Sequence, residues 1–173
     1  MEQNLCCAII GQHPMRFPWG FDEEDTGCQN LKLALAQKIM ELRQQGVARF
    51  AVVADCGIGL YAGECINALR QHDADLMLFV VTPHEEQATK WTPDLRNRYF
   101  KLLEDCTLMA LASHRKTPTC EYDAYRKIVD YADMVLAVCG SRHGAGRRRG
   151  RRDGICHRAK IVCKTDNLMI LTS

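Results

Sequence analysis

The chain has 173 residues, of which 47% are hydrophobic and 25% are charged, as is ordinary for a globular protein. Its longest apolar stretches fall well short of the roughly 20 residues of a membrane-spanning helix. Because no basic run precedes the first apolar segment, we expect no signal peptide either. The composition therefore predicts a cytoplasmic protein with a single domain over residues 1–173 and no membrane partner.

The ten cysteines do not follow the spacing of a metal site or a disulfide framework. None of them forms a Cys-x-x-Cys pair, so we expect small, mostly buried apolar residues and predict neither a metal nor a cofactor. Cys56 and Cys139 lie at predicted strand ends, where a thiol can react, but no paired base is visible in the sequence.

The net charge of +2 conceals a basic block near the end of the chain. Six arginines and no acidic residue lie between Arg142 and Arg152, and without these six the formal net charge is −4. Such a block either binds phosphate backbones or forms a solvated loop. Residues 140–173 are atypical of the rest of the chain in this respect.

Apolar runs and helical repeats alternate along the whole chain. Short apolar runs predict strands over 5–11, 47–54, 76–81, 107–112 and 134–139, with two short candidates at 160–163 and 168–171. We expect Pro83 to stop the third strand. Apolar residues at helical spacing predict a helix that ends near Gly46 and carries Leu31, Leu35, Ile39 and Leu42. The same spacing, or a proline at a first turn, predicts helices over 60–72, 93–104 and 122–131. This alternation predicts an α/β fold: a single Rossmann-like, doubly wound and mostly parallel sheet with helices on both faces.

A glycine-rich turn follows the second predicted strand and leads into a helix. Gly57, Gly59 and Gly63 lie in this turn and the helix start. Glycines let the backbone approach an anion, and the free N–H groups of a first helical turn point at it. The turn is therefore either a phosphate cradle or a tight strand–helix connection.

Parallel sheets bind ligands at the carboxyl ends of their strands, so the loops after the predicted strands define the expected site. The residues that we expect to contact a ligand are Gly11, Gln12, His13, Asp55, Gly57, Gly59, Glu64, Gln87, Trp91, Gly140 and Ser141. Arg115 and Lys116 follow the fourth strand and either neutralise phosphate or remain solvated. Asp130 and Asp133 lie at the amino end of the fifth strand, where capping or solvation is expected.

Three of these residues each allow two interpretations of their role. Glu64, placed in the first turn of the second helix, is either stabilised by the helix dipole or acts on a ligand, as a ribose-binding group or a general base. It is the one weak catalytic candidate. His13 is either solvated or a ligand contact. Trp91 either stacks on a base, as a lid, or anchors its loop to the core.

Several stretches together resemble one protein family. They include 7–14 (Cys-Ala-Ile-Ile-Gly-Gln-His-Pro), 17–20 (Phe-Pro-Trp-Gly), 60–64 (Leu-Tyr-Ala-Gly-Glu) and 129–133 (Val-Asp-Tyr-Ala-Asp), with Pro83, Gln87, Trp91 and Arg98-Tyr99 between them. In this order, over about residues 5–140, they resemble the bacterial YpsA-like proteins. These belong to the SLOG superfamily, whose Rossmann-like domain is shared by DprA and the LOG phosphoribohydrolases.

The chain departs from the family pattern at specific places. Val53-Ala54 and Gly59 replace the usual entry and acidic residue of the second turn, and Ala124-Tyr125 stands where relatives carry Arg-Asn. The expected Gly-Gly-Thr turn after the fifth strand is replaced by the arginine-rich stretch. Residues 151–156, read one base later with suitable codons, spell Gly-Gly-Thr-Ala-Tyr-Ala, which suggests a frameshift that the coding DNA would reveal.

The resemblance implies a binder of a nucleotide or nucleotide derivative, of uncharacterised role, such as a ligand sensor. One alternative is a LOG-like hydrolase of nucleoside monophosphates, which would need a glycine-threonine phosphate turn with a paired arginine and glutamate. Another is DprA-like binding of single-stranded nucleic acid through the arginine block, although aromatic stacking partners are scarce there. Self-association is left open, and so is a copy that folds but binds nothing.

Overall fold

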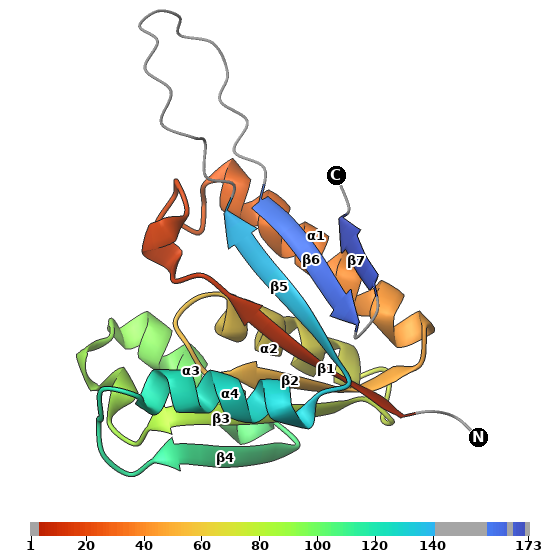
Figure 1. Cartoon of the computed structure of the whole chain (residues 1–173). Helices are drawn as coiled ribbons and strands as arrows, with labels where there is room; N and C mark the ends of the chain where they lie inside the picture. Colours follow the sequence, from red (N-terminus) through yellow and green to blue (C-terminus); the bar gives the residue numbers. More distant parts are fainter. Residues whose placement is uncertain (1–3, 141–158, 166–167, 172–173) are drawn as a thin grey trace, which may run out of the picture.

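The computed structural model describes residues 4–140, 159–165 and 168–171. Its sheet has the strand order β4-β3-β2-β1-β5-β6-β7. The first five strands run parallel, and the last two are antiparallel additions beside β5 (Figure 1). The strands are β1 (Leu5–Gly11), β2 (Val47–Val53), β3 (Met77–His84), β4 (Leu108–Ser113), β5 (Met134–Gly140), β6 (Ala159–Thr165) and β7 (Leu168–Leu171). The predicted α/β architecture is confirmed.

Helices cover the two faces of the sheet unequally. Helices α1 (Thr26–Gln44), α2 (Ile58–Arg70) and α3 (Pro93–Asp105) pack on one face and share its apolar core. Helix α4 (Cys120–Tyr131) covers the other face of the parallel strands, where Ala124 and Ile128 are fully buried (Figure 1). The chain therefore winds in both directions from β1, and the strand order reverses between β1 and β5. In folds of this kind a ligand crevice forms at such a reversal.

The predicted end of the third strand is wrong, because β3 runs through Pro83 to His84. The reason lies in the neighbouring strand. β2 ends at Val53, which pairs with Val81. Because backbone groups of successive residues in a strand point to opposite sides, those of Pro83 point to the same side as those of Val81, toward β2. β2 has already ended there, so the proline removes no hydrogen bond between strands. The strand therefore carries His84 up to the carboxyl edge of the sheet.

Asp133 joins the start of β5 to the start of β1. Its carboxylate Oδ2 accepts a hydrogen bond from the Cys6 N–H at 2.8 Å, and its own N–H donates to the Cys6 carbonyl at 2.9 Å. Asp130, in contrast, forms an exposed ion pair with Arg126 on the surface of α4. The structural role expected for these aspartates is thus visible, and Asp133 fixes the register of two strands that are far apart in the sequence.

Two short 3-10 helices lie in segments predicted as loops. They are η1 (Pro14–Arg16), after β1, and η2 (Gln87–Lys90), after β3. Both lie at the carboxyl edge of the sheet. Within the described residues, no helix is long and apolar enough to cross a membrane.

Candidate functional site

A cleft of about 730 Å³ opens at the carboxyl edge of the parallel strands. Its volume lies in the range of small-molecule sites. The loops after β1, β2, β3 and β4 and the start of α4 surround it. Its lining residues are Gly11, His13, Pro14, Val53, Asp55, Cys56, Pro83, His84, Glu86, Gln87, Thr89, Lys90, Trp91, Lys116, Glu121 and Tyr125.

Asp55 occupies the glycine turn with its own carboxylate. Oδ1 accepts hydrogen bonds from the Gly57 N–H at 2.8 Å and the Gly59 N–H at 2.9 Å. The phosphate-cradle hypothesis expected these N–H groups to donate to a bound phosphate. A helix N-terminus favours an anion, and here the chain itself supplies that anion. The N–H groups of Gly57 and Gly59 therefore have a partner within the chain.

Both glycines are also required by close packing. A Cβ on Gly59 would overlap the Val53 carbonyl, and one on Gly57 would lie 2.9 Å from the Pro14 ring. The tight strand–helix connection thus accounts for both glycines, while phosphate binding by them stays a prediction.

Tyr125 holds the second oxygen of Asp55. Its hydroxyl donates to Asp55 Oδ2 at 2.6 Å and links α4 to the turn after β2. Burial raises the pKa of Asp55, and the hydrogen bonds from Tyr125 and the two glycine amides offset only part of that rise. Some surface of Asp55 stays accessible, but protein encloses the carboxylate itself. Burial, followed by the neighbouring Asp55 charge, also raises the pKa of Tyr125, so its phenol stays protonated.

Cys56 has the histidine neighbour that the sequence did not reveal. His13 Nε2 lies 3.7 Å from Cys56 Sγ. However, His13 Nδ1 accepts the Met15 N–H at 3.3 Å, so the hydrogen-bond network assigns the proton of the neutral ring to Nε2. The ring therefore faces the thiol as a donor rather than as a base. Burial, with the Asp55 charge, raises the pKa of Cys56 to about 11, which keeps the thiol protonated.

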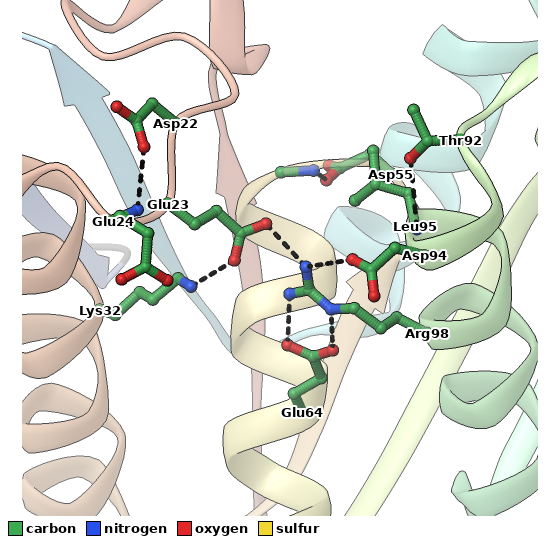
Figure 2. A network of polar contacts seen from close by, with 11 residues as sticks. Asp22, Glu23, Glu24, Lys32, Asp55, Glu64, Thr92, Asp94, Leu95 and Arg98 are labelled. Carbon is green, nitrogen blue, oxygen red and sulfur yellow. Dashed lines mark hydrogen bonds and ion pairs between the residues drawn. The ribbon is translucent and has the colours of Figure 1, made fainter.

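Glu64 lies outside the lining of the cleft, in a polar network between α1, α2 and α3 (Figure 2). Because α2 begins at Ile58, Glu64 is in its second turn, and the predicted first-turn position is wrong. Its two carboxylate oxygens accept hydrogen bonds from Arg98 Nε at 2.7 Å and Nη2 at 2.8 Å. Arg98 Nη1 also donates to Glu23 at 2.7 Å, and Lys32 donates to the same Glu23 carboxylate.

The electrostatics of this network favour ionised side chains. Burial alone would raise the pKa of Glu23, but the hydrogen bonds and charges of Arg98 and Lys32 outweigh it and lower the pKa. The same carboxylates, led by Glu64, raise the pKa of Arg98 further above its ordinary value. Glu64 is therefore engaged as the partner of a charged guanidinium.

Gln87 and Trp91 both lie on the cleft wall that follows β3. The Gln87 side-chain amide donates to the Ala54 carbonyl at the end of β2. The Trp91 ring packs edge-on against Tyr99, with centroids 5.3 Å apart, and against the main core. Trp91 thus anchors its loop and lines the cleft at once.

The structure brings only part of the predicted set together. Gly11, His13, Asp55, Gln87 and Trp91 line the cleft, whereas Gly57 and Gly59 form the turn beside it. The Gln12 N–H donates to the Val138 carbonyl, and Gly140 ends β5 next to β1. Ser141 and the arginine-rich stretch lie outside the described residues, as does the frameshift hypothesis for 151–156.

Sequence reasoning missed several lining residues, above all Tyr125, Glu121, His84 and Lys90. The sequence marked Tyr125 only as a departure from the Arg-Asn pair of the relatives, and it gave no sign of the contact with Asp55, which forms because α4 packs on this face of the sheet. His84 was hidden by the expected stop at Pro83. Its Nδ1 atom is buried and has no hydrogen-bond partner within the described residues. A signal for Lys90 did exist, because it directly precedes Trp91.

Comparisons with known proteins agree with this fold. The YpsA family model, described as the YspA SLOG family, matches residues 7–147. A UPF0398 protein of Halalkalibacterium halodurans is 32% identical over 84 residues, which are 49% of this chain and 44% of that protein. The UPF0398 protein YpsA of Bacillus subtilis is 27% identical over 134 residues, 76% of this chain and 73% of that protein. The match thus spans less than half the length of the first of these relatives.

One solved structure is that of Salmonella enterica RcsB bound to promoter rprA. The match covers 72% of this chain and 67% of the RcsB chain, with 15% identity and a TM-score of 0.30. That score is too low to carry an argument.

The sheet and its cleft define a Rossmann-like α/β protein with a small-molecule-sized site. Because its family model covers most of the chain, the protein belongs to the YpsA family of SLOG proteins.

Proposed function

We propose that the protein binds a nucleotide or nucleotide derivative in the cleft at the carboxyl edge of the sheet. The observation that carries the proposal is the mixed lining of this cleft. Rings, cations and hydrogen-bonding groups converge on one cavity of ligand size at the carboxyl ends of the strands, the edge at which doubly wound sheets bind their ligands. A nucleotide presents a flat base, a sugar with hydroxyls and an anionic phosphate, and each part has a matching group in the lining.

The matching groups come from different loops. The Trp91 indole offers a surface for a base, and the Glu121 carboxylate can accept hydrogen bonds from sugar hydroxyls. Lys90 and Lys116, on the loops after the neighbouring strands β3 and β4, supply positive charge for phosphate. Because Asp55 already fills the glycine turn, we place the phosphate near these lysines.

Isothermal titration calorimetry of the full chain with AMP, ADP-ribose, NAD and adenosine tests the proposal. We expect one phosphorylated compound to bind more tightly than adenosine. Lys116→Gln should weaken that binding roughly tenfold, because a hydrogen bond to a charged group is worth about 1.5 kcal/mol or more. Trp91→Leu should weaken both adenosine and nucleotide binding.

The matched control is Lys101→Gln, since Lys101 is on α3, is 67% exposed and pairs with Asp105 outside the cleft. Its affinity should equal that of the unaltered protein. Equal losses in the Lys116 and Lys101 variants, or binding of none of the four compounds, would contradict the proposal.

We do not extend the proposal to hydrolysis or to nucleic acid. Both Glu64 oxygens are bound by Arg98 outside the cleft lining, so nothing in the described residues favours Glu64 as a base. The arginine block that motivated nucleic-acid binding lies outside those residues.

A further inference from the structure

Strand β4 is an edge strand of unusual composition. It lies at one end of the sheet and pairs only with β3 among the described residues. Its six residues, Leu-Met-Ala-Leu-Ala-Ser, include no charge and no proline, and Leu108 and Met109 are 62% and 54% exposed. Natural proteins protect exposed edges with charges, prolines or bulges, because an unprotected apolar edge pairs with other chains. β4 carries no such device within its own residues.

The register shows which backbone groups of β4 are available. The Val81 carbonyl accepts a hydrogen bond from Ala54 on the β2 side, so the alternation of a strand directs Val80 and Thr82 toward β4. In the parallel ladder Val80 is opposite Met109, and Thr82 is opposite Leu111. The N–H and C=O groups of Met109 and Leu111 therefore face the outer edge. The Leu111 carbonyl accepts a hydrogen bond from Lys127 of α4 at 3.1 Å, which leaves its second lone pair available.

The charges that flank β4 have opposite signs at its two ends. Glu104 and Asp105 precede the strand, and Arg115 and Lys116 follow it. In an antiparallel pair of identical strands the acidic end of each copy lies beside the basic end of the other. In a parallel pair, like charges would meet. Opposite charges across neighbouring strands stabilise pairing, and like charges destabilise it.

We propose that two copies of this chain associate through antiparallel pairing of their β4 strands, forming one continuous sheet. A two-fold axis at Ala110 gives the register. It places Ala110 opposite its own copy, Met109 opposite Leu111, and Asp105 close to Arg115 of the second copy. Met109 and Leu111, whose backbone groups face outward, then form the hydrogen-bonded pairs. This inference does not depend on the proposed ligand.

Sedimentation velocity of the full chain over a wide range of concentrations tests the association. We expect a species of twice the 19.6 kDa chain mass at the higher concentrations. Met109→Lys puts two charges near the axis and should leave only the monomer. Met40→Lys is the matched control, since Met40 is 45% exposed on α1, and it should preserve the dimer. Circular dichroism confirms that both variants are folded.

The register has its own test. Residues opposite each other in a non-hydrogen-bonded pair have Cα atoms about 4.5 Å apart, which is within disulfide range. Mild oxidation of Ala110→Cys should therefore give a covalent dimer, whereas the unaltered chain under the same conditions should not. Arg115→Glu should weaken the dimer, and adding Asp105→Lys should restore it. A monomer at every concentration, or equal dimerisation of the Met109 and Met40 variants, would overturn the proposal.

Discussion

At the residue scale, Asp55 joins two of the elements that surround the candidate site, the turn after β2 and helix α4. A carboxylate that accepts two amide hydrogen bonds and a phenolic one is stabilised in place, although burial works against its charge. Its position supplies a partner for the Gly57 and Gly59 amides from within the chain. The turn is built around the carboxylate of Asp55, which lies two residues before the first glycine, Gly57.

Asp55 predicts a specific pH dependence of stability. Its pKa is raised on folding, so the folded state binds this proton more tightly than the unfolded state does. Its contribution to stability is thus fully present below the unfolded pKa, near 3.8, and is lost as the pH rises through the folded pKa. Asp55→Asn removes the titration and keeps an oxygen for the two amides. In urea unfolding at several pH values, the variant should lose less stability than the unaltered protein over this window. An identical pH profile would contradict the assignment.

Tyr125→Phe tests the other side of the same contact. The variant removes the hydroxyl that donates to Asp55 Oδ2, so this oxygen loses that hydrogen bond. We therefore expect a loss of roughly 1–3 kcal/mol in the free energy of unfolding. Tyr122→Phe is the control, because Tyr122 lies on the same helix and is 67% exposed. Urea unfolding at neutral pH measures both. A Tyr125 variant as stable as the Tyr122 variant would show that the hydrogen bond contributes nothing net.

At the scale of elements, Arg98 joins three segments of the chain. It extends from α3 to Glu64 on α2 and to Glu23 in the loop that leads into α1 (Figure 2). The loop fixed in this way is the one that begins with His13 and Pro14 in the cleft. The network therefore helps to hold one wall of the candidate site.

Arg98→Met leaves two partly buried carboxylates without their cation. We expect a loss of about 1–3 kcal/mol, between the values for exposed and for buried ion pairs. The pKa of Glu23 should also rise toward its unfolded value, so Glu23 should contribute a smaller loss of stability in acid to the variant than to the unaltered protein. Urea unfolding across the acid range measures both effects. Arg96→Met, exposed on the same helix, should change neither.

Some elements of the fold could be predicted from the sequence more closely than others. Apolar runs and helical stripes predicted most ends of the strands and helices to within about two residues, because burial in this sheet follows local pattern. The stripe that begins at Leu31 did not mark the start of α1, which lies at Thr26. The end of β3 was missed, since tolerance of Pro83 depends on where β2 ends. The partners of Asp55 and Glu64 were missed for the same kind of reason. Tyr125 lies 70 residues from Asp55 and Arg98 lies 34 from Glu64, so no local motif links them.

At the scale of the whole molecule, the sheet is assembled around its first strand. β1 pairs with β2 on one side and with β5 on the other, and β6 and β7 extend the sheet beyond β5. The two apolar cores lie on opposite faces of the parallel strands and meet only through them. The cleft at the carboxyl edge combines residues from Gly11 to Tyr125, which belong to several loops and to α4.

The clamp between Cys6 and Asp133 has a consequence for synthesis on the ribosome. These two residues are 127 positions apart, so β1 has a vacant side until the chain reaches β5. At the usual rate of translation, the interval between the end of β2 and the start of β5 is on the order of 4–16 s. During that time the nascent chain exposes an apolar strand with one unpaired edge. Efficient production of this protein should therefore depend on chaperones that shield β1 until Asp133 emerges.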